Sequence, residues 1–404
     1  QPVTMAQTST MATAAMKRGK HVFLEKPMAK TAADAKRMVD AAKLAQKTVK
    51  GNYTDCVAYF DDGIRARQLQ EQAIITTMTE VRDIADIEET LVIYTPAIPK
   101  DMEELVYVQE KGYRLIKRSR ALGEIASTQK CLGVAGTHGK TTTSTLLSHL
   151  YTHSGEGCSA FLGGISKNYH TNLLLSKNPV LVAEADEFDR SFLQLFPDVA
   201  IITSTDADHL DIYGDVNTIR DAFAEFASQI KKEGALVLKK GVEIDLQNVA
   251  AKVYSYSFNE VADFYPADVE LLEGGYFRFN LVYPAYKDIN GVEHLSGRIE
   301  NCTVGIPGWV NAENGVAAAA AALIGGLAPE QVKEGLAAFQ GVERRFDIHI
   351  NTPKIAYIDD YAHHPREISS AISSIRNIFP GRKLCGIFQP HLYTRTRDFA
   401  PEFA

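Results

Sequence analysis

The amino-acid sequence predicts an α/β protein with a parallel-sheet P-loop central domain, flanked by partial Rossmann-like domains on the N-terminal and C-terminal sides. Three observations lead to this prediction. Short apolar runs typical of buried strands alternate with segments that carry apolar residues at helical spacing. A glycine-rich turn lies between one such strand and one such helix, at residues 133–139. Clusters of polar residues follow several strands directly, at the end of a parallel sheet where sites assemble.

The expected elements define the domains. We expect strands at residues 20–24, 91–94, 114–116, 130–132, 180–183, 199–203, 235–238, 355–358 and 384–388, and helices at 11–16, 32–45, 102–111, 144–150, 223–230 and 366–378. Residues 252–304, including 254–258, alternate like antiparallel strands and predict an annex on the central domain. The predicted domains are 1–53, a junction at 54–87, 88–126, the ATP-binding central domain 127–340 and a C-terminal domain, 341–404, that ends early.

Composition limits the classes of function. With 404 residues, 45% of them hydrophobic, the chain can form two or three domains. A net charge of −7 gives no support for nucleic-acid binding, and no apolar run reaches the length of a membrane span. The sequence shows no secretion leader after Gln1. The five widely spaced cysteines are those expected of reduced thiols in a cytoplasmic protein: Cys56, Cys131, Cys158, Cys302 and Cys385.

Residues 136–143, Gly-Thr-His-Gly-Lys-Thr-Thr-Thr, have the features of a phosphate-binding loop. Gly136 and Gly139 allow the backbone to curl around an anion, and the following helix start adds partial positive charge. Lys140 would neutralise the β- and γ-phosphates, and the Thr141 hydroxyl would bind Mg²⁺. Val134 stands where the general pattern has glycine. The alternative is a glycine-rich turn with a solvent-exposed lysine.

Two neighbouring strands are followed by acidic clusters. Glu184 comes directly after the strand at 180–183, and Asp206, Asp208 and His209 follow the strand at 199–203. Because Mg²⁺ needs oxygen ligands, Glu184 is the first choice for a metal ligand, and His209 is the second, for a neighbouring ion. The alternative is a solvated acidic loop in the first case, and a capping aspartate with a loop histidine in the second.

Three further groups are candidates for nucleotide or substrate binding. Asn311 and Asn314 lie three apart at a helix start, where both can face one pocket, and an amide matches the adenine edge, although asparagine is also a common helix cap. Residues 341–347 predict a hinge in which two consecutive arginines, the second being Arg345, could contact phosphate. The adjacent histidines at 363 and 364 cannot easily both ligate one metal, which favours substrate contact or a cap.

Residues 1–53 resemble part of the Gfo/Idh/MocA oxidoreductases, through Glu25-Lys26-Pro27 after an expected strand. In that family the lysine lies at the nicotinamide. The glycine-rich dinucleotide turn that should precede it is absent from this sequence, so the tripeptide is equally a strand exit with a surface lysine.

From about residue 89 onward, the chain resembles the Mur ligases of peptidoglycan synthesis, in the branch that adds the first amino acid. Seven motifs in the family's order carry the resemblance: residues 136–143, 184–193, 208–211, 311–314, 344–346, 359–365, and 389–391 together with 395–398.

The resemblance implies an ATP- and Mg²⁺-dependent ligase that joins L-alanine to the carboxylate of UDP-N-acetylmuramate through an acyl phosphate. It implies that catalysis depends on Lys140, His209, His364, His391 and Arg395. It places the nucleotide against Gly136, Thr137, His138, Gly139, Lys140, Thr141, Thr142, Asn311, Asn314 and Arg345, and the metal ions at Thr141, Glu184 and His209.

The chain departs from the family in lacking a glycine-rich UDP-binding turn near its start. Two competing hypotheses therefore stand beside the ligase: a truncated or fused fragment that binds ATP without turnover, and an NAD(P)-dependent oxidoreductase.

Overall fold

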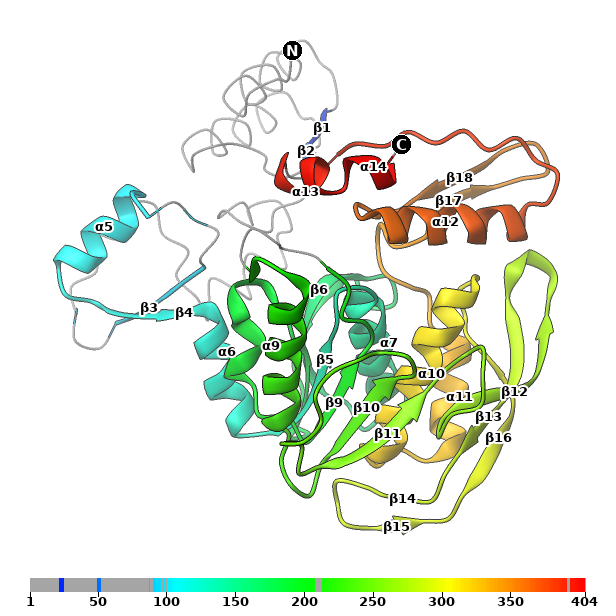
Figure 1. Cartoon of the computed structure of the whole chain (residues 1–404), viewed down its shortest axis with the longest axis horizontal. Coiled ribbons are helices and arrows are strands. Elements are labelled where there is room, and N and C mark those ends of the chain that lie inside the picture. The colour runs from blue at the N-terminus through cyan, green and yellow to red at the C-terminus, as the bar shows by residue number, and fades with distance from the viewer. Residues whose placement is uncertain are drawn as a thin grey trace. The chain divides into compact units, whose positions relative to one another are not determined.

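The computed structural model describes residues 22–24, 49–51, 87, 90–95, 98, 100–207, 213–390 and 393–403. The chain forms two compact units, Gln1–Ala121 and Leu122–Ala404 (Figure 1). The helices expected at 11–16 and 32–45 lie outside the described residues. Within the described ranges, no helix combines the length and the apolar character needed to cross a bilayer.

The described residues of the first unit form two parallel strand pairs. β1 (Val22–Leu24) pairs with β2 (Val49–Gly51), and β3 (Leu91–Tyr94) pairs with β4 (Arg114–Lys117). Helix α5 (Glu103–Glu110) joins β3 to β4. Two glutamates in its first turn stabilise the helix, because their negative charges interact favourably with the positive end of the helix dipole. Gly112, with φ +77°, ends the helix in a left-handed turn. The expected strands at 91–94 and 114–116 and the helix at 102–111 are thus confirmed.

The second unit is built on a mostly parallel sheet. Its seven described strands are β5 (Lys130–Ala135), β6 (Ser159–Ser166), β7 (Thr171–Leu174), β8 (Val180–Glu184), β9 (Val199–Ile202), β10 (Ala235–Lys239) and β11 (Lys252–Tyr256). Their order is β11-β10-β9-β5-β8-β6-β7, and only the β6–β7 pair is antiparallel. β5, which carries the glycine-rich turn, is therefore flanked by β8 and β9.

Both faces of this sheet are buried, as a parallel sheet requires. Leu132 and Val134 of β5 pack on one face, against α7 (Lys140–His153), α10 (Trp309–Ile324) and α11 (Pro329–Ala338). Cys131 and Ala135 point to the other face, against α9 (Val216–Ser228), the 3₁₀ segment η1 (Phe188–Gln194) and the end of α6 (Arg118–Ser127). Burial raises the pKa of the Cys131 thiol to about 12, so this cysteine is inert.

An antiparallel annex follows the sheet, with one correction to the sequence prediction. The annex consists of β12 (Tyr265–Leu271), β13 (Phe277–Tyr283) and β16 (Gly297–Thr303), with a short pair, β14 (Tyr286–Lys287) and β15 (Glu293–His294). The 3₁₀ turn η2 (Glu273–Gly275) joins β12 to β13. Assigning residues 254–258 to the annex was wrong, because β11 pairs in parallel with β10. An edge strand is half covered, so its residues alternate like those of an antiparallel strand.

The described residues in the last part of the chain form an antiparallel strand pair and three helices. β17 (Asp347–Asn351) pairs with β18 (Ala356–Asp359), followed by α12 (Pro365–Ile378), α13 (Tyr393–Asp398) and α14 (Ala400–Phe403). The expected strand at 384–388 is wrong, and so is the expected parallel arrangement around it. Residues 382–390 form no strand, and Ile387 is 101% exposed. A strand needs a partner for its backbone groups, and among the described residues none pairs with this segment.

Candidate nucleotide site

The turn between β5 and α7 has the backbone geometry of an anion-binding loop. Gly136 has φ +127°, and a Cβ at this position would overlap Thr203 Oγ1 and lie 2.8 Å from Ser204 N. Gly139 has φ +83° and caps α7 in the left-handed region. Both positions therefore require glycine. The first turn of a helix carries N–H groups that the helix itself does not use, so α7 begins with donors beside the loop.

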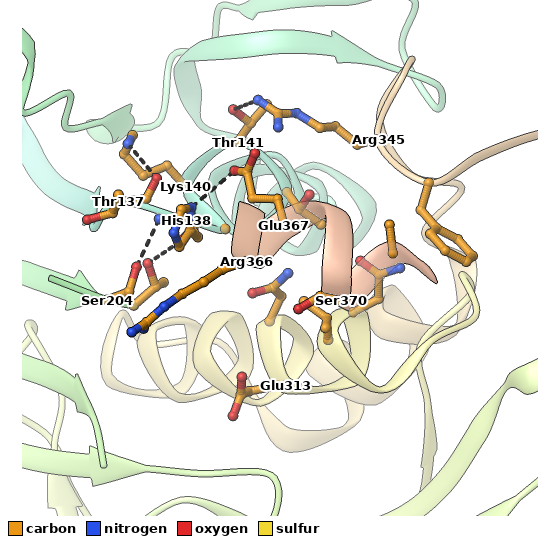
Figure 2. Close-up of a pocket in the computed structure, with 18 of the residues that line it drawn as sticks. Thr137, His138, Lys140, Thr141, Ser204, Glu313, Arg345, Arg366, Glu367 and Ser370 are labelled. Carbon is orange, nitrogen blue, oxygen red and sulfur yellow. Dashed lines mark hydrogen bonds and ion pairs between the residues drawn. The ribbon is translucent and has the colours of Figure 1, made fainter. Parts of the chain in front are cut away.

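A cavity of about 400 Å³ lies beside this loop. It is lined by the loop, by the ends of β8 and β9, by the first turns of α10 and by one side of α12 (Figure 2). Ten of the residues predicted for the nucleotide or the metal line it: Thr137, His138, Gly139, Lys140, Thr141, Thr142, Glu184, Asn311, Asn314 and Arg345. Gly136 lies in the same turn and supplies its conformation.

Lys140 is held by a buried carboxylate. Its Nζ donates to Gly136 O at 2.7 Å and lies 2.8 Å from Glu187 Oε2. The side chain of Glu187 is only 4% exposed. Burial opposes the charge of Lys140, but Glu187 and Asp186 outweigh it and raise the pKa of this lysine above its usual range. Burial also raises the pKa of Glu187. The loop thus holds a permanent cation matched by one anion.

Glu184 is oriented by the chain on both sides of it. The Thr141 hydroxyl donates to Glu184 Oε1 at 3.0 Å, and Gly163 N donates to Glu184 Oε2 at 2.8 Å. A Cβ at Gly163 would overlap the carboxylate, so this glycine in β6 makes room for Glu184. The carboxylate therefore lies next to Thr141, the first threonine of α7, as a metal ligand near the phosphates would.

His138 lies between two acidic side chains. Its Nδ1 is 3.1 Å from Glu367 Oε1, and its Nε2 is 3.4 Å from Asp206 Oδ2 (the first contact is dashed in Figure 2). Burial lowers the pKa of His138, but hydrogen bonds with Asp206 and Glu367 outweigh it and raise that pKa to about 9. The same contact holds the pKa of Glu367 below its usual range, although burial opposes this. The imidazole is therefore protonated at neutral pH.

The two asparagines lie on the first turns of α10. Asn311 and Asn314 are 9% and 6% exposed, and both line the cavity. Asn311 Nδ2 donates to Pro307 O at 2.6 Å, while Asn314 Oδ1 would lie 3.0 Å from a Cβ at Gly139. Glu313 extends from the other side of this turn in Figure 2 and binds Lys239 at 2.7 Å. Asn314 therefore lies nearest the phosphate loop, and Asn311 one turn farther away.

The hinge places two arginines around one ring. The guanidinium carbons of Arg344 and Arg345 lie 5.2 and 5.0 Å from the centre of the Tyr361 ring. Arg345 Nη2 also reaches Thr141 Oγ1, at 3.4 Å. Arg344 and Phe346 adopt positive φ values of 61° and 50°, which cost energy for residues with a Cβ. Arg345 thus reaches the side of the cavity where Thr141 and Glu184 lie.

The other predicted residues have different outcomes. His364 caps α12 by accepting a hydrogen bond from Arg366 N at 3.3 Å, and its Nε2 lies 3.2 Å from Ala207 O. Arg395 is 5% exposed in α13 and does not line the cavity. His209 and His391 lie outside the described residues.

The sequence prediction assigned no role to four residues of the site: Gly163, Glu187, Asp206 and Glu367. Glu367 carried a usable signal, because a proline begins α12 and a glutamate two residues later is typical of a capping box. The other three depend on which side chains the fold brings near the loop, and no local pattern specifies them.

Four family models match the chain. The Mur ligase middle domain matches residues 134–322, the Mur ligase glutamate ligase domain matches 344–404, and the Mur ligase family catalytic domain matches 55–130. The oxidoreductase family model with an NAD-binding Rossmann fold matches residues 4–53.

Curated relatives cover most of the chain. The UDP-N-acetylmuramate--L-alanine ligase of Parabacteroides distasonis is 49% identical over 78% of this chain. The enzyme of the same name from Porphyromonas gingivalis is 48% identical over 78% of this chain. The alignments cover 66% and 67% of these relatives, so the chain spans about two thirds of their length.

A solved structure shows the same fold. The UDP-N-acetylmuramate-alanine ligase MurC of Thermotoga maritima matches with a TM-score of 0.65 and 24% identity, covering 94% of this chain and 83% of that one. A murein peptide ligase from Psychrobacter arcticus matches with a TM-score of 0.58 and 20% identity, covering 96% of this chain and 78% of that one. With a relative at 48% identity over two thirds of its length, the chain belongs to the Mur ligase family.

Proposed function

We propose that the chain is an ATP-dependent ligase that joins L-alanine to the carboxylate of UDP-N-acetylmuramate through an acyl phosphate. The proposal takes its substrates from the names of the curated relatives. It includes a cytoplasmic location, because ATP is a cytoplasmic nucleotide. The observation that carries it is the arrangement of Lys140, Thr141 and Glu184 around one end of the cavity, where the triphosphate would lie.

The nucleotide would lie along the cavity from the loop to α10. The backbone of residues 136–142 and Lys140 would bind the phosphates, because loop N–H groups and a fixed ammonium suit an anion. Asn311 and Asn314, one turn apart on α10, would bind the adenine edge. Arg345 reaches Thr141 from the opposite side, so it would contact the phosphate end.

The residues present fit a magnesium ion. Thr141 and Glu184 offer hard oxygen donors 3.0 Å apart beside the loop. Within the described residues, no group of three or more His, Cys, Asp or Glu side chains could hold a metal ion on its own. The proposed ion would therefore share phosphate oxygens with the nucleotide. It would supply charge neutralisation for the transferred phosphoryl group, and His209 belongs to the proposal for a neighbouring ion.

In this reaction the main tasks of the protein would be to align the substrates and to neutralise the charge on the phosphate groups. The muramoyl carboxylate would attack the γ-phosphate and displace ADP, and the alanine amine would then attack the carbonyl carbon of the acyl phosphate, forming the amide, losing a proton and releasing phosphate. Lys140 and Arg345 would stabilise the charge on the transferred group. His364, His391 and Arg395 are proposed to lie near the amino acid and the muramoyl carboxylate.

A phosphate-release assay tests the proposal. We expect ATP hydrolysis only when Mg²⁺, L-alanine and UDP-N-acetylmuramate are all present, with one phosphate released for each alanine joined. D-alanine and UDP-N-acetylglucosamine are the matched controls. Phosphate release that does not depend on L-alanine or on UDP-N-acetylmuramate would contradict the proposed ligase activity.

The competing functions give different results in the same preparation. An ATP-binding fragment without turnover would bind ATP with Mg²⁺ in calorimetry and release no phosphate. The oxidoreductase model matches residues 4–53, so the assay should also include NAD(P)H and follow its absorbance. We expect no change in that absorbance.

A further inference from the structure

Helix α12 forms one wall of the nucleotide cavity and is fixed at both ends. Ser370, Ala371 and Ser374 line the cavity along the helix. At its far end, Ile378 packs so closely on Gly275 of η2 that a Cβ there would overlap it. At its near end, Glu367 faces the phosphate loop (Figure 2). The helix therefore spans the cavity from the loop to the annex.

The near end is held through His138. This side chain belongs to the phosphate loop, and its two ring nitrogens face carboxylates from different elements: Glu367 of α12 at 3.1 Å and Asp206 after β9 at 3.4 Å. Of these two contacts, the one from Nδ1 to Glu367 is a hydrogen bond and the one from Nε2 to Asp206 is an ion pair, and two carboxylates on either side favour the imidazolium over the neutral ring. His138 is thus a charged bridge between the loop, the central sheet and α12.

Glu367 joins two parts of the chain with one carboxylate. While Oε1 faces His138, Oε2 accepts from the backbone N–H groups of His363 and His364, at 3.0 and 3.3 Å. The adjacent Arg366 pairs with Asp206. These contacts close a ring that runs from His138 through the start of α12 to Asp206 and back.

A second contact adds to the ring. The His364 and His138 rings lie 4.8 Å apart, centre to centre, and His364 Nε2 faces Ala207 O. The start of α12 is therefore tied to the phosphate loop and to the segment after β9 together. If the loop changes shape, His138 moves and the helix loses its bridge.

We propose that Glu367 is a positioning residue that couples helix α12 to the phosphate loop through His138, so that the position of α12 follows the conformation of the loop. Its effect on turnover rests on the proposed function; the coupling itself does not. Glu367 acts through His138, so its role is to place other groups.

The competing explanation is that Glu367 serves α12 only as a helix cap. Two substitutions separate the roles. Glu367→Gln keeps a side-chain oxygen that can accept from the N–H groups of His363 and His364, as a capping box requires, but removes the charge that faces His138. His138→Gln leaves the cap intact and removes the charged bridge. A positioning role predicts that both variants loosen α12, whereas a cap alone predicts that neither does.

Hydrogen–deuterium exchange of the full chain measures the coupling without turnover. We expect the amides of residues 365–378 to exchange at least about fivefold faster in His138→Gln and in Glu367→Gln. Because the substitutions remove one shared contact, His138→Gln combined with Glu367→Gln should exchange no faster than the more affected single variant. Unchanged exchange in His138→Gln, or effects that multiply in the double variant, would overturn the coupling.

A matched control and a folding check belong to the experiment. Glu330→Gln changes an exposed glutamate that follows a proline at the start of α11, and it should leave α12 exchange unaltered. Protection of β5, β8 and β9 should be retained in every variant, which shows that the sheet is folded. If the chain is a ligase, Glu367→Gln should lower kcat by about tenfold or more, while KM for ATP changes less than kcat. A loss confined to KM would also contradict the proposal, and a chain without turnover leaves the exchange result valid.

Discussion

Lys140 and Glu187 show how the site balances charge. The ammonium lies 2.8 Å from a glutamate that is 4% exposed, and two loop carbonyls lie close to it. Neither charge is screened by solvent, so each depends on the other. A substitution at Lys140 therefore removes a proposed phosphate contact and also leaves Glu187 buried without its partner.

We expect Lys140→Ala to lower ligase turnover at least about a hundredfold, as loss of a charge contact in the transition state does. The measurement is the phosphate-release assay with all substrates saturating. The control is Lys232→Ala, which replaces an exposed lysine distant in sequence from the phosphate loop, and this variant should retain activity. Because the lone glutamate could itself destabilise the fold, Lys140→Ala should be compared with Lys140→Ala/Glu187→Gln. Turnover that survives in either variant would refute the assigned role.

Helix α10 illustrates how an element is selected by packing. Ala317, Ala318, Ala319, Ala320, Ala321 and Ala322 are all 0% exposed, so the helix is buried on every side. Alanine has high helix propensity, and its small side chain lets neighbouring helices and the sheet approach closely. The first two turns of this helix carry Asn311 and Asn314, and the tight packing therefore fixes the adenine end of the proposed site.

We expect Ala319→Leu to destabilise the chain by about 1–3 kcal/mol, because added methylenes have no space in a filled core. Urea unfolding followed by circular dichroism gives the free energy of unfolding. Ala337→Leu, at an exposed position of α11, is the matched control and should change it by less than about 0.5 kcal/mol. Equal effects at both positions would show that α10 is not packed as described.

At the scale of the whole second unit, the last part of the chain is joined to the central sheet by ionic contacts. Lys167 of the central part pairs with Asp347 of β17 at 2.7 Å, and His138 pairs with Glu367 of α12. Contacts of this kind depend on protonation. The stability of the unit should therefore depend on pH through the bridging histidine.

The direction of this pH dependence follows from the pKa of His138, which is raised from 6.5 to about 9. A raised pKa means that the charged form is favoured in the folded state. This contribution, roughly 3 kcal/mol at about 1.4 kcal/mol per pKa unit, is fully present below pH 6.5 and is lost as pH rises through about 9. We expect Tm to fall between pH 7 and 10 more steeply in the unaltered chain than in His138→Gln. Parallel Tm curves would contradict the assignment.

Strong local patterns made most of the second unit predictable. β8, β9 and β10 are continuous apolar runs, and the glycine-rich turn sits between a strand and a helix, so each could be predicted without knowledge of its neighbours. β6 was not predicted, because Gly163 and Gly164 in its middle are typical of a turn. Gly163 is there to accommodate the Glu184 carboxylate, which no local pattern reveals.

The same distinction applies to the candidate site. Lys140, Thr141, Glu184, Asn311 and Asn314 were predicted from motifs and line one cavity. Glu187, Asp206 and Glu367 acquire their partners only when segments distant in sequence meet. The strand expected at 384–388 has the right composition, but whether it forms depends on a neighbouring strand, which composition does not encode.

Glu187 affects which anions can bind to the phosphate loop. Its buried carboxylate forms an ion pair with the ammonium of Lys140, which is the contact that an incoming anion would make. A free sulfate or orthophosphate must compete with this internal surrogate while offering no base to α10. A nucleotide bound as proposed would compensate for the loss of this ion pair with contacts along its whole length, so we expect the protein to discriminate against small inorganic anions.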